Sequence, residues 1–171
     1  MKKKFKKILL IGVMVVIGLA TLTSCNNISY NAVLFDHANE WMHIDFLRDN
    51  LTQGTGQFFN GYEWELISEE ISLPAYRVHI VTNIEKFKEL FEEFPPSIDF
   101  EREILIVYIV TNIYMGSSYR IRSLSLSNSV LSVELRRKRR RVVHAASAPL
   151  QRCFVIRMNK QNISEVNIAL R

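Results

Sequence analysis

The chain contains two cysteines, Cys25 and Cys153, and only the first lies where thiol chemistry is expected. Cys25 follows Leu22-Thr23-Ser24 directly after an apolar run and is the only soft nucleophile in that neighbourhood. A thiol is partly thiolate near neutral pH, so it can be alkylated by an electrophile. Cys153 lies in the apolar stretch Cys-Phe-Val-Ile, which favours a buried small side chain over a reactive one.

The segment before Cys25 has the composition of an export signal. Five lysines precede an apolar run over residues 8–20, which is shorter than the roughly 20 residues that a membrane-spanning helix needs. Leu22-Thr23-Ser24-Cys25 resembles the bacterial lipobox, in which the thiol receives a diacylglycerol and the chain is cut on the N-terminal side of the cysteine. We expect residues 1–24 to be a lipoprotein signal peptide and residues 25–35 a lipidated tether. The alternative is an uncleaved anchor with a chance cysteine.

Either alternative places the rest of the chain outside the cytoplasm, attached to the cell membrane. Removing the five lysines of the signal from the 22 Lys and Arg leaves 17, which equals the 17 Asp and Glu. The mature chain is therefore formally neutral, and the basic balance of the full sequence does not argue for a nucleic-acid partner. With Cys25 lipidated, Cys153 has no partner for a disulfide. Residues 36–171 are long enough for one hydrophobic core and one domain.

Neither a catalytic group nor a metal site is expected, and no cofactor beyond the acyl lipid on Cys25. The segment Met-Gly-Ser-Ser-Tyr at 115–119 lacks the Gly-x-Ser-x-Gly pattern of a nucleophile elbow. Paired glutamates such as Glu92 and Glu93 have the ordinary spacing of exposed surfaces. The four histidines lack the spacing of common metal sites: His37, His43, His79 and His144. We predict that the protein is not an enzyme.

Six consecutive basic residues follow a predicted strand: Arg136, Arg137, Lys138, Arg139, Arg140 and Arg141. The chain from residue 104 onward contains 12 basic and 2 acidic residues, whereas residues 36–103 contain 15 acidic and 5 basic ones. We expect an exposed loop here, because long cationic side chains need water or partners. Nucleic-acid binding would require stacking aromatic residues or a recognition helix, and neither accompanies the run. Three alternatives stay open: an anionic lipid or envelope polymer, an acidic protein or the acidic half of the same molecule, and a solvated loop without a partner.

Hydrophobic periodicity predicts a mainly β, α+β domain, an antiparallel sheet or sandwich with one packed amphipathic helix. A capping box of Thr82 and Glu85 is expected to begin the helix, and Pro95-Pro96 to end it. A hairpin is expected across Ser127-Asn128-Ser129, with a bulge near Arg122-Ser123. Strands are predicted at residues 40–46, 62–66, 75–81, 104–110, 118–126, 130–136, 152–158 and 164–170, of which 104–110 is the buried central strand.

Residues 83–170 resemble the C-terminal domain of the PrcB family, which is named for a lipoprotein accessory subunit of a bacterial cell-surface protease complex. The resemblance is carried by PPSIDFEREILIVYIV, MGSSYRIRSLSLSNSVLSVEL and SAPLQRCFVIRMNK. The family pattern has Asp-Phe before a buried strand, a glycine turn ending in Tyr, and a Pro ahead of the final strand pair. The corresponding residues here are Asp99, Phe100, Gly116, Tyr119 and Pro149. The resemblance implies that they are structural and that the protein is a binding or stabilising subunit.

These observations predict a membrane-anchored, extracytoplasmic lipoprotein that acts as a non-catalytic binding or accessory subunit. Its expected partners are the bilayer, through Cys25, and a cell-surface or secreted protein such as a protease. The alternative is an envelope-associated module that binds anionic lipid or polymer through Arg136–Arg141.

Overall fold

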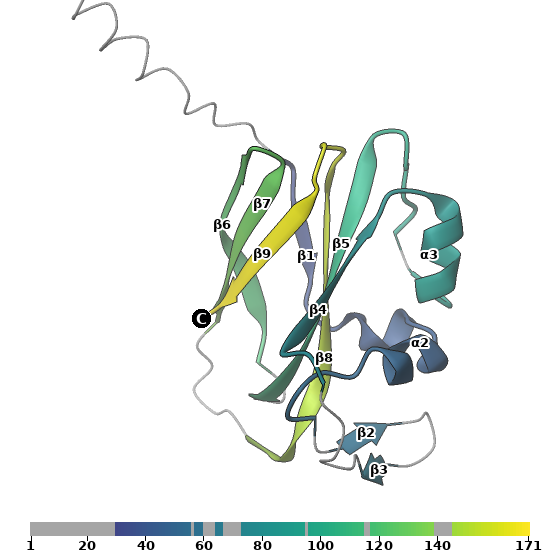
Figure 1. The fold of residues 1–171 in the computed structure, drawn as a ribbon, viewed down its shortest axis with the longest axis vertical. Coiled ribbons are helices and arrows are strands. Elements are labelled where there is room, and N and C mark those ends of the chain that lie inside the picture. Colours follow the sequence, from purple (N-terminus) through teal and green to yellow (C-terminus); the bar gives the residue numbers. More distant parts are fainter. Residues whose placement is uncertain are drawn as a thin grey trace, which may run out of the picture.

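Two β-sheets pack face to face, and short helices cover the outer face of the larger sheet (Figure 1). The computed structural model of the chain describes residues 30–55, 57–59, 64–66, 73–94, 96–114, 117–138 and 145–171. The mainly β, sandwich-like α+β fold expected from the sequence is confirmed.

The larger sheet has six strands and the smaller sheet three. The larger sheet contains β1 (Val33–Phe35), β2 (Gln57–Phe59), β3 (Trp64–Leu66), β4 (Tyr76–Val81), β5 (Glu103–Tyr114) and β8 (Ala145–Asn159). The smaller sheet has the order β6 (Tyr119–Ser127), β7 (Val130–Arg137) and β9 (Glu165–Leu170). The helical layer contains the 3₁₀ helix η1 (Ala38–Trp41) and the α-helices α2 (Ile44–Asp49) and α3 (Ile84–Leu90).

The core lies on both faces of the central pair β5 and β8, which run antiparallel. Ile104 and Ile106 of β5 face the smaller sheet, whereas Leu105 and Val107 face the helices. A strand covered on both faces has no polar side, which is why this segment reads as an unbroken apolar run. The prediction of a buried central strand is confirmed.

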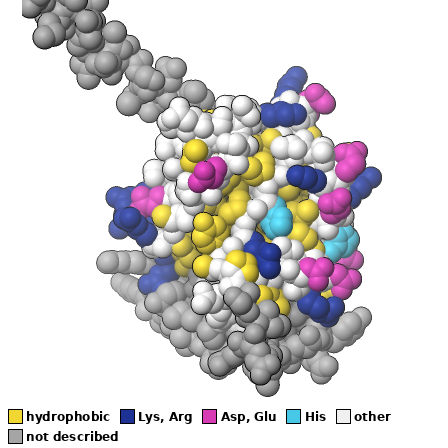
Figure 2. Space-filling view, in the orientation of Figure 1, with side chains coloured by type: hydrophobic (Ala, Val, Ile, Leu, Met, Phe, Trp, Pro, Cys, Tyr) yellow, Lys and Arg dark blue, Asp and Glu magenta, His cyan; other side chains and the backbone are white. Residues whose placement is uncertain are grey.

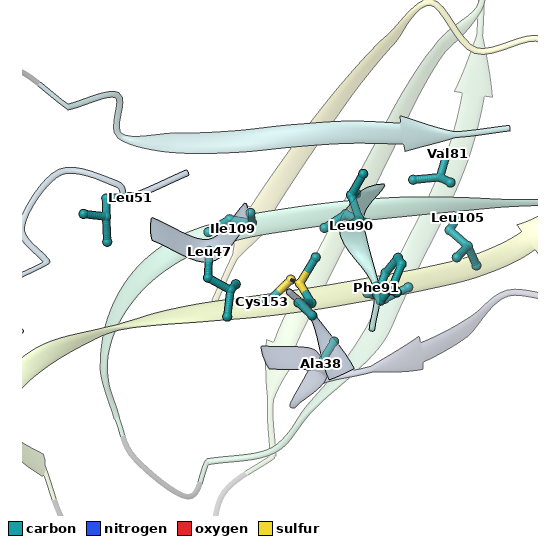
Figure 3. Packing of buried hydrophobic residues seen from close by; sticks show 12 residues of the cluster. Ala38, Leu47, Leu51, Val81, Leu90, Phe91, Leu105, Ile109 and Cys153 are labelled. Atoms are coloured by element: carbon teal, nitrogen blue, oxygen red, sulfur yellow. Dashed lines mark hydrogen bonds between the residues drawn. The ribbon is translucent and has the colours of Figure 1, made fainter. Parts of the chain in front are cut away.

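The segment predicted as a strand over residues 40–46 is helical instead, in η1 and α2. A helix of six residues is too short to show a 3.6-residue period, so its apolar residues also fit the alternation of a strand. Tertiary contacts fix the helical form. Leu47 is buried against the larger sheet (Figure 3), and the side-chain nitrogen of Gln151 donates to the carbonyls of Leu47 and Asn50 at 3.0 and 2.9 Å.

The predicted helix is present as α3, but its ends differ from the prediction. Asn83 is the N-cap, and its side-chain oxygen accepts from the backbone N–H of Lys86 at 2.9 Å. The expected capping box of Thr82 and Glu85 is therefore wrong by one residue. The helix ends at Leu90, before the prolines. The carbonyl of Leu90 accepts from the N–H of His43, and Phe91 forms a β-bridge with Met42, the residue after η1. These two contacts prevent the helix from continuing.

The smaller sheet contains the predicted hairpin and bulge. Asn128 and Ser129, with φ of 50° and 63°, form the turn between β6 and β7. The register shifts between Ile121 and Ser123, which confirms the bulge. β9 runs parallel to β7, so the smaller sheet is mixed. The parallel pairing arises because the connection after β8 crosses from the larger sheet to the smaller one. β9 then begins beside Val130, the first residue of β7.

The expected tether over residues 25–35 overlaps the folded domain. β1 pairs with β8, with Val33 opposite Arg157 and Phe35 opposite Val155. The carbonyl of Tyr30 accepts from the N–H of Asn159 at 3.2 Å. Among the described residues, none of the helices has the length and apolar character needed to cross a bilayer.

Candidate binding surface on the smaller sheet

The structure places the start of the arginine run in β7 rather than in a loop. Arg136 and Arg137 are the last two residues of the strand and pair with Arg120 and Tyr119 of β6. The N–H of Lys138 donates to the carbonyl of Ser118 at 2.8 Å. The predicted loop is wrong for Arg137, because β6 supplies a backbone partner this far, whereas Arg136 ends the predicted strand over residues 130–136. The last three residues of the run lie outside the described residues: Arg139, Arg140 and Arg141.

Strand alternation gives the two arginines of β7 different surroundings. Arg137 is in phase with Leu131 and Leu135, which are buried on the inner face of the smaller sheet, and its Nη1 atom is buried. Arg136 points to the outer face and is exposed, as is Lys138 beyond the strand. Of the two arginines of β7, Arg136 is therefore the more accessible to a partner.

Three arginines lie side by side on the outer face of the smaller sheet, one in β6, one in β7 and one directly after β9. Arg120 is directly opposite Arg136. On the other side of β7, the N–H of Arg171 donates to the carbonyl of Leu135 at 2.8 Å and its carbonyl accepts from Arg137, so Arg171 lies beside Arg136. All three side chains are exposed. We refer to Arg120, Arg136 and Arg171 as the arginine row.

The charge of the row is only partly compensated. Arg122 donates to Oε1 of Glu134 at 2.8 Å, and Nε of Arg171 lies 3.9 Å from the same oxygen. Within the described part of the chain, Arg120 and Arg136 have no acidic partner. Like charges directly opposite each other in a sheet are destabilising, so this arrangement costs stability unless an anion binds.

A shallow hollow of about 360 Å³ lies on the smaller sheet beside the row. Exposed Tyr76 of β4 lies at its edge. Small polar side chains provide hydroxyl and amide groups along it: Ser123, Ser125, Ser132 and Asn167. Arg171 and Glu134 also line the hollow, so it is continuous with the arginine row.

The helical side of the domain has the opposite charge balance. Figure 2 shows most magenta side chains on the side of the helices, where dark-blue ones are interspersed with them, and a separate dark-blue group on the side where β6, β7 and the C-terminus lie. The acidic residues of the helices outnumber the basic ones: Glu40, Asp45, Asp49, Glu85 and Glu89 against Arg48, Lys86 and Lys88. Among the described residues, the helices are thus net acidic and the strands of the smaller sheet net basic.

No family model, functionally described protein or solved structure matches this chain. The likeness to the PrcB family therefore rests on the residues singled out in the sequence. Asp99 and Phe100 form the turn before β5. The side chain of Asp99 accepts from the N–H of Glu101 at 3.1 Å, and the ring of Phe100 packs 5.8 Å from that of Phe87.

Tyr119 is buried where the two sheets meet. Its N–H donates to Oδ2 of Asp36 at 2.6 Å, and its ring packs edge-on against Phe154 at 5.2 Å. Gly116 lies outside the described residues, and Pro149 is described only as part of the backbone of β8. Asp99, Phe100 and Tyr119 thus contact other parts of the domain, and the side chain of Tyr119, which precedes Arg120 in β6, is buried on the inner face of the smaller sheet.

Among the described residues, no group of three or more His, Cys, Asp or Glu is placed to hold a metal ion. His43 contacts the carbonyl of Lys88 at 3.0 Å, and His79 contacts the side chain of Asn50 at 3.0 Å. His37 lies 3.3 Å from the guanidinium of Arg152. His144 is outside the described residues. Each described histidine thus has a local contact within the domain.

Cys153 is fully buried in the cluster between the larger sheet and the helices (Figure 3). Its Sγ lies 3.0 Å from the sulfur of Met42, and burial raises the pKa of its thiol. The prediction of a buried side chain is confirmed. Cys25 lies outside the described residues.

Proposed function

We propose that this chain is a lipid-anchored, extracytoplasmic lipoprotein that serves as a non-catalytic binding or accessory subunit. Its partner is a secreted or cell-surface protein such as a protease. The lipobox-like segment ending at Cys25 supports the anchor, and the resemblance of residues 83–170 to the PrcB family supports the accessory role.

The observation that carries the proposal is the arginine row on the outer face of the smaller sheet. The larger sheet is covered by the smaller sheet on one face and by helices on the other. The outer face of the smaller sheet carries three exposed cations, of which Arg120 and Arg136 have no acidic partner among the described residues. Complementary charges across an interface speed association and exclude wrong partners. An acidic partner would also remove the repulsion between Arg120 and Arg136.

The same row supports a second candidate, an envelope module that binds anionic lipid or polymer through the Arg136–Arg141 region. Each basic residue close to an anionic bilayer contributes about 1 kcal/mol to attachment. This candidate differs from the first in its ligand: it predicts salt-sensitive binding to anionic vesicles without any protein.

Cross-linking in the native cell tests the proposed function. The tagged chain would be compared with Arg120→Gln/Arg136→Gln and with the matched control Arg102→Gln/Lys86→Gln, which removes the same charge away from the row. One dominant protein should co-purify with the unaltered chain and the control, and should be lost with the row variant. Repeated recovery of lipid or polymer without a protein would overturn the accessory role and favour the second candidate.

A further inference from the structure

The end of the domain nearest to the lipid anchor can be assigned from the length of chain after Cys25. This inference rests on the proposed function, because it takes Cys25 as the lipidated residue. Tyr30 follows Cys25 by five residues, which span at most about 18 Å when fully extended. Tyr30 is bonded to Asn159, where β8 ends. The turn at Ser129 lies at the same end, since the N–H of Ser164 donates to its carbonyl at 2.8 Å.

The arginine row lies at the other end of the smaller sheet. β7 leaves the anchor end at Val130 and reaches Arg136 six residues later, about 20 Å further along the strand. In Figure 1 the C-terminus, next to the row, lies well away from the turn between β6 and β7. A separation of about 20 Å exceeds two Debye lengths at physiological salt, which are about 8 Å each. Headgroups of the anchoring bilayer are therefore screened from the row when the strands stand upright on the membrane.

The surroundings of the row fit a polypeptide. Neighbouring strands are about 4.8 Å apart, and Arg171 continues the pairing of β9 with β7 by one residue, so the three arginines span about 10 Å. Acidic side chains at alternate positions of an extended segment are about 7 Å apart, so two of them fit within this span. Carboxylates form strong, charge-assisted hydrogen bonds with guanidinium groups.

The hollow adds groups that a featureless anionic surface would not need. The hydroxyls of Ser125 and Ser132 and the amide of Asn167 can bond to the backbone of a bound segment. Glu134 lies among the arginines and carries a negative charge. It would repel a continuous anionic surface, whereas a peptide can place a cation or a backbone N–H beside it.

We propose that the arginine row and the adjoining hollow bind an extended, acidic segment of a partner protein, at the end of the domain that points away from the lipid anchor.

The test uses the lipidated mature chain in nanodiscs of phosphatidylcholine and a fluorescent peptide that alternates glutamate with serine. The peptide should bind, and the affinity should fall at least about tenfold in Arg120→Gln/Arg136→Gln. The control Arg102→Gln/Lys86→Gln should bind as well as the unaltered chain. A peptide with glutamine in place of glutamate should not bind, and about 0.5 M salt should weaken binding.

Discs that contain phosphatidylglycerol separate this proposal from membrane binding. If the row points away from the bilayer, the peptide should bind equally well to both kinds of disc. Loss of peptide binding in the anionic discs would overturn the proposal, since it would show that the row contacts its own membrane. Absence of peptide binding in both kinds of disc would overturn the proposal as well. The proposed function would still be tested separately, by cross-linking in the native cell.

Discussion

The guanidinium of Arg152 lies 4.9 Å above the ring of Tyr119, and both side chains are buried. Nε of Arg152 donates to the carbonyl of Asp36 at 3.0 Å. Nη2 of Arg152 donates to the carbonyl of Ser117 and also lies 3.8 Å from the carboxylate of Asp36. These contacts join the chain after β1, the start of β6 and the middle of β8. Arg152 thus connects the two sheets near the end of the domain that carries the arginine row.

Replacing this arginine should destabilise the fold. Arg152→Met keeps much of the side-chain volume but leaves the half-buried carboxylate of Asp36 without its cation, which should lower the free energy of unfolding by about 3 kcal/mol. The exposed pair of Arg102 and Asp99 gives a control: Arg102→Met should cost less than about 1 kcal/mol. Urea unfolding measures both. Equal losses for the two variants would contradict the connecting role of Arg152.

The arginine row should cost stability in the absence of a partner. Arg136→Glu places a carboxylate directly opposite Arg120 and beside Arg171, turning repulsion into attraction. The free energy of unfolding should rise by about 0.5–1 kcal/mol, and peptide binding should be lost. The gain should shrink at high salt, because exposed charges are screened. A variant that is less stable than the unaltered chain at low salt would show that the row is not strained.

The sequence is informative wherever burial is strong and local. β5 reads as an apolar run because both of its faces are covered, and the turn after β6 is marked by Asn128, a residue that tolerates positive φ. The short helix α2 is not marked in this way. Its form depends on Gln151, about a hundred residues later in the chain, which bonds to its carbonyls.

The arginine row, like α2, depends on contacts between residues that are distant in the sequence. The run of basic residues in the sequence identifies Arg136 as a candidate. Arg120 and Arg171 lie beside Arg136 because of the registers in which β6 and the parallel strand β9 pair with β7. The bulge beside Arg122 can be predicted from the broken alternation of the strand. Which strands then lie next to each other depends on the crossing from β8 to β9, for which the sequence has no local signal.

The turn between β6 and β7 can be stabilised by a single change. Ser129 has a φ of 63°, a conformation in which a residue with a Cβ is strained and glycine is not. Ser129→Gly should raise the free energy of unfolding by about 0.5–1 kcal/mol. Ser125→Gly, in the interior of β6, should lower it by a similar amount. Thermal unfolding of the two variants would decide, and a loss of stability in Ser129→Gly would contradict the turn geometry.

Cys153 should be inaccessible in the folded protein. Its side chain is fully buried beside Met42, and burial raises the pKa of the thiol, so both access and thiolate formation are suppressed. In a Cys25→Ser chain, a thiol reagent should react with Cys153 only as fast as unfolding exposes it, and at once in denaturant. Cys153→Ser should cost about 1–3 kcal/mol, because it buries a hydroxyl. Rapid reaction under native conditions would contradict this packing.

His79 should make stability fall on mild acidification. Burial, together with the positive charges of Arg77 and Lys86, lowers the pKa of His79 below its ordinary value of 6.5. Between that lowered pKa and 6.5 the unfolded chain binds the proton and the folded chain does not, so unfolding takes up a proton and is favoured as the pH falls. The contribution is complete above pH 6.5, declines below it, and levels off beneath the folded pKa.

His79→Gln should remove this component. Urea unfolding from about pH 8 to about pH 5 would give the difference in unfolding free energy between the two chains. This difference should become smaller as the pH falls. A difference that stays constant would contradict the lowered pKa of His79.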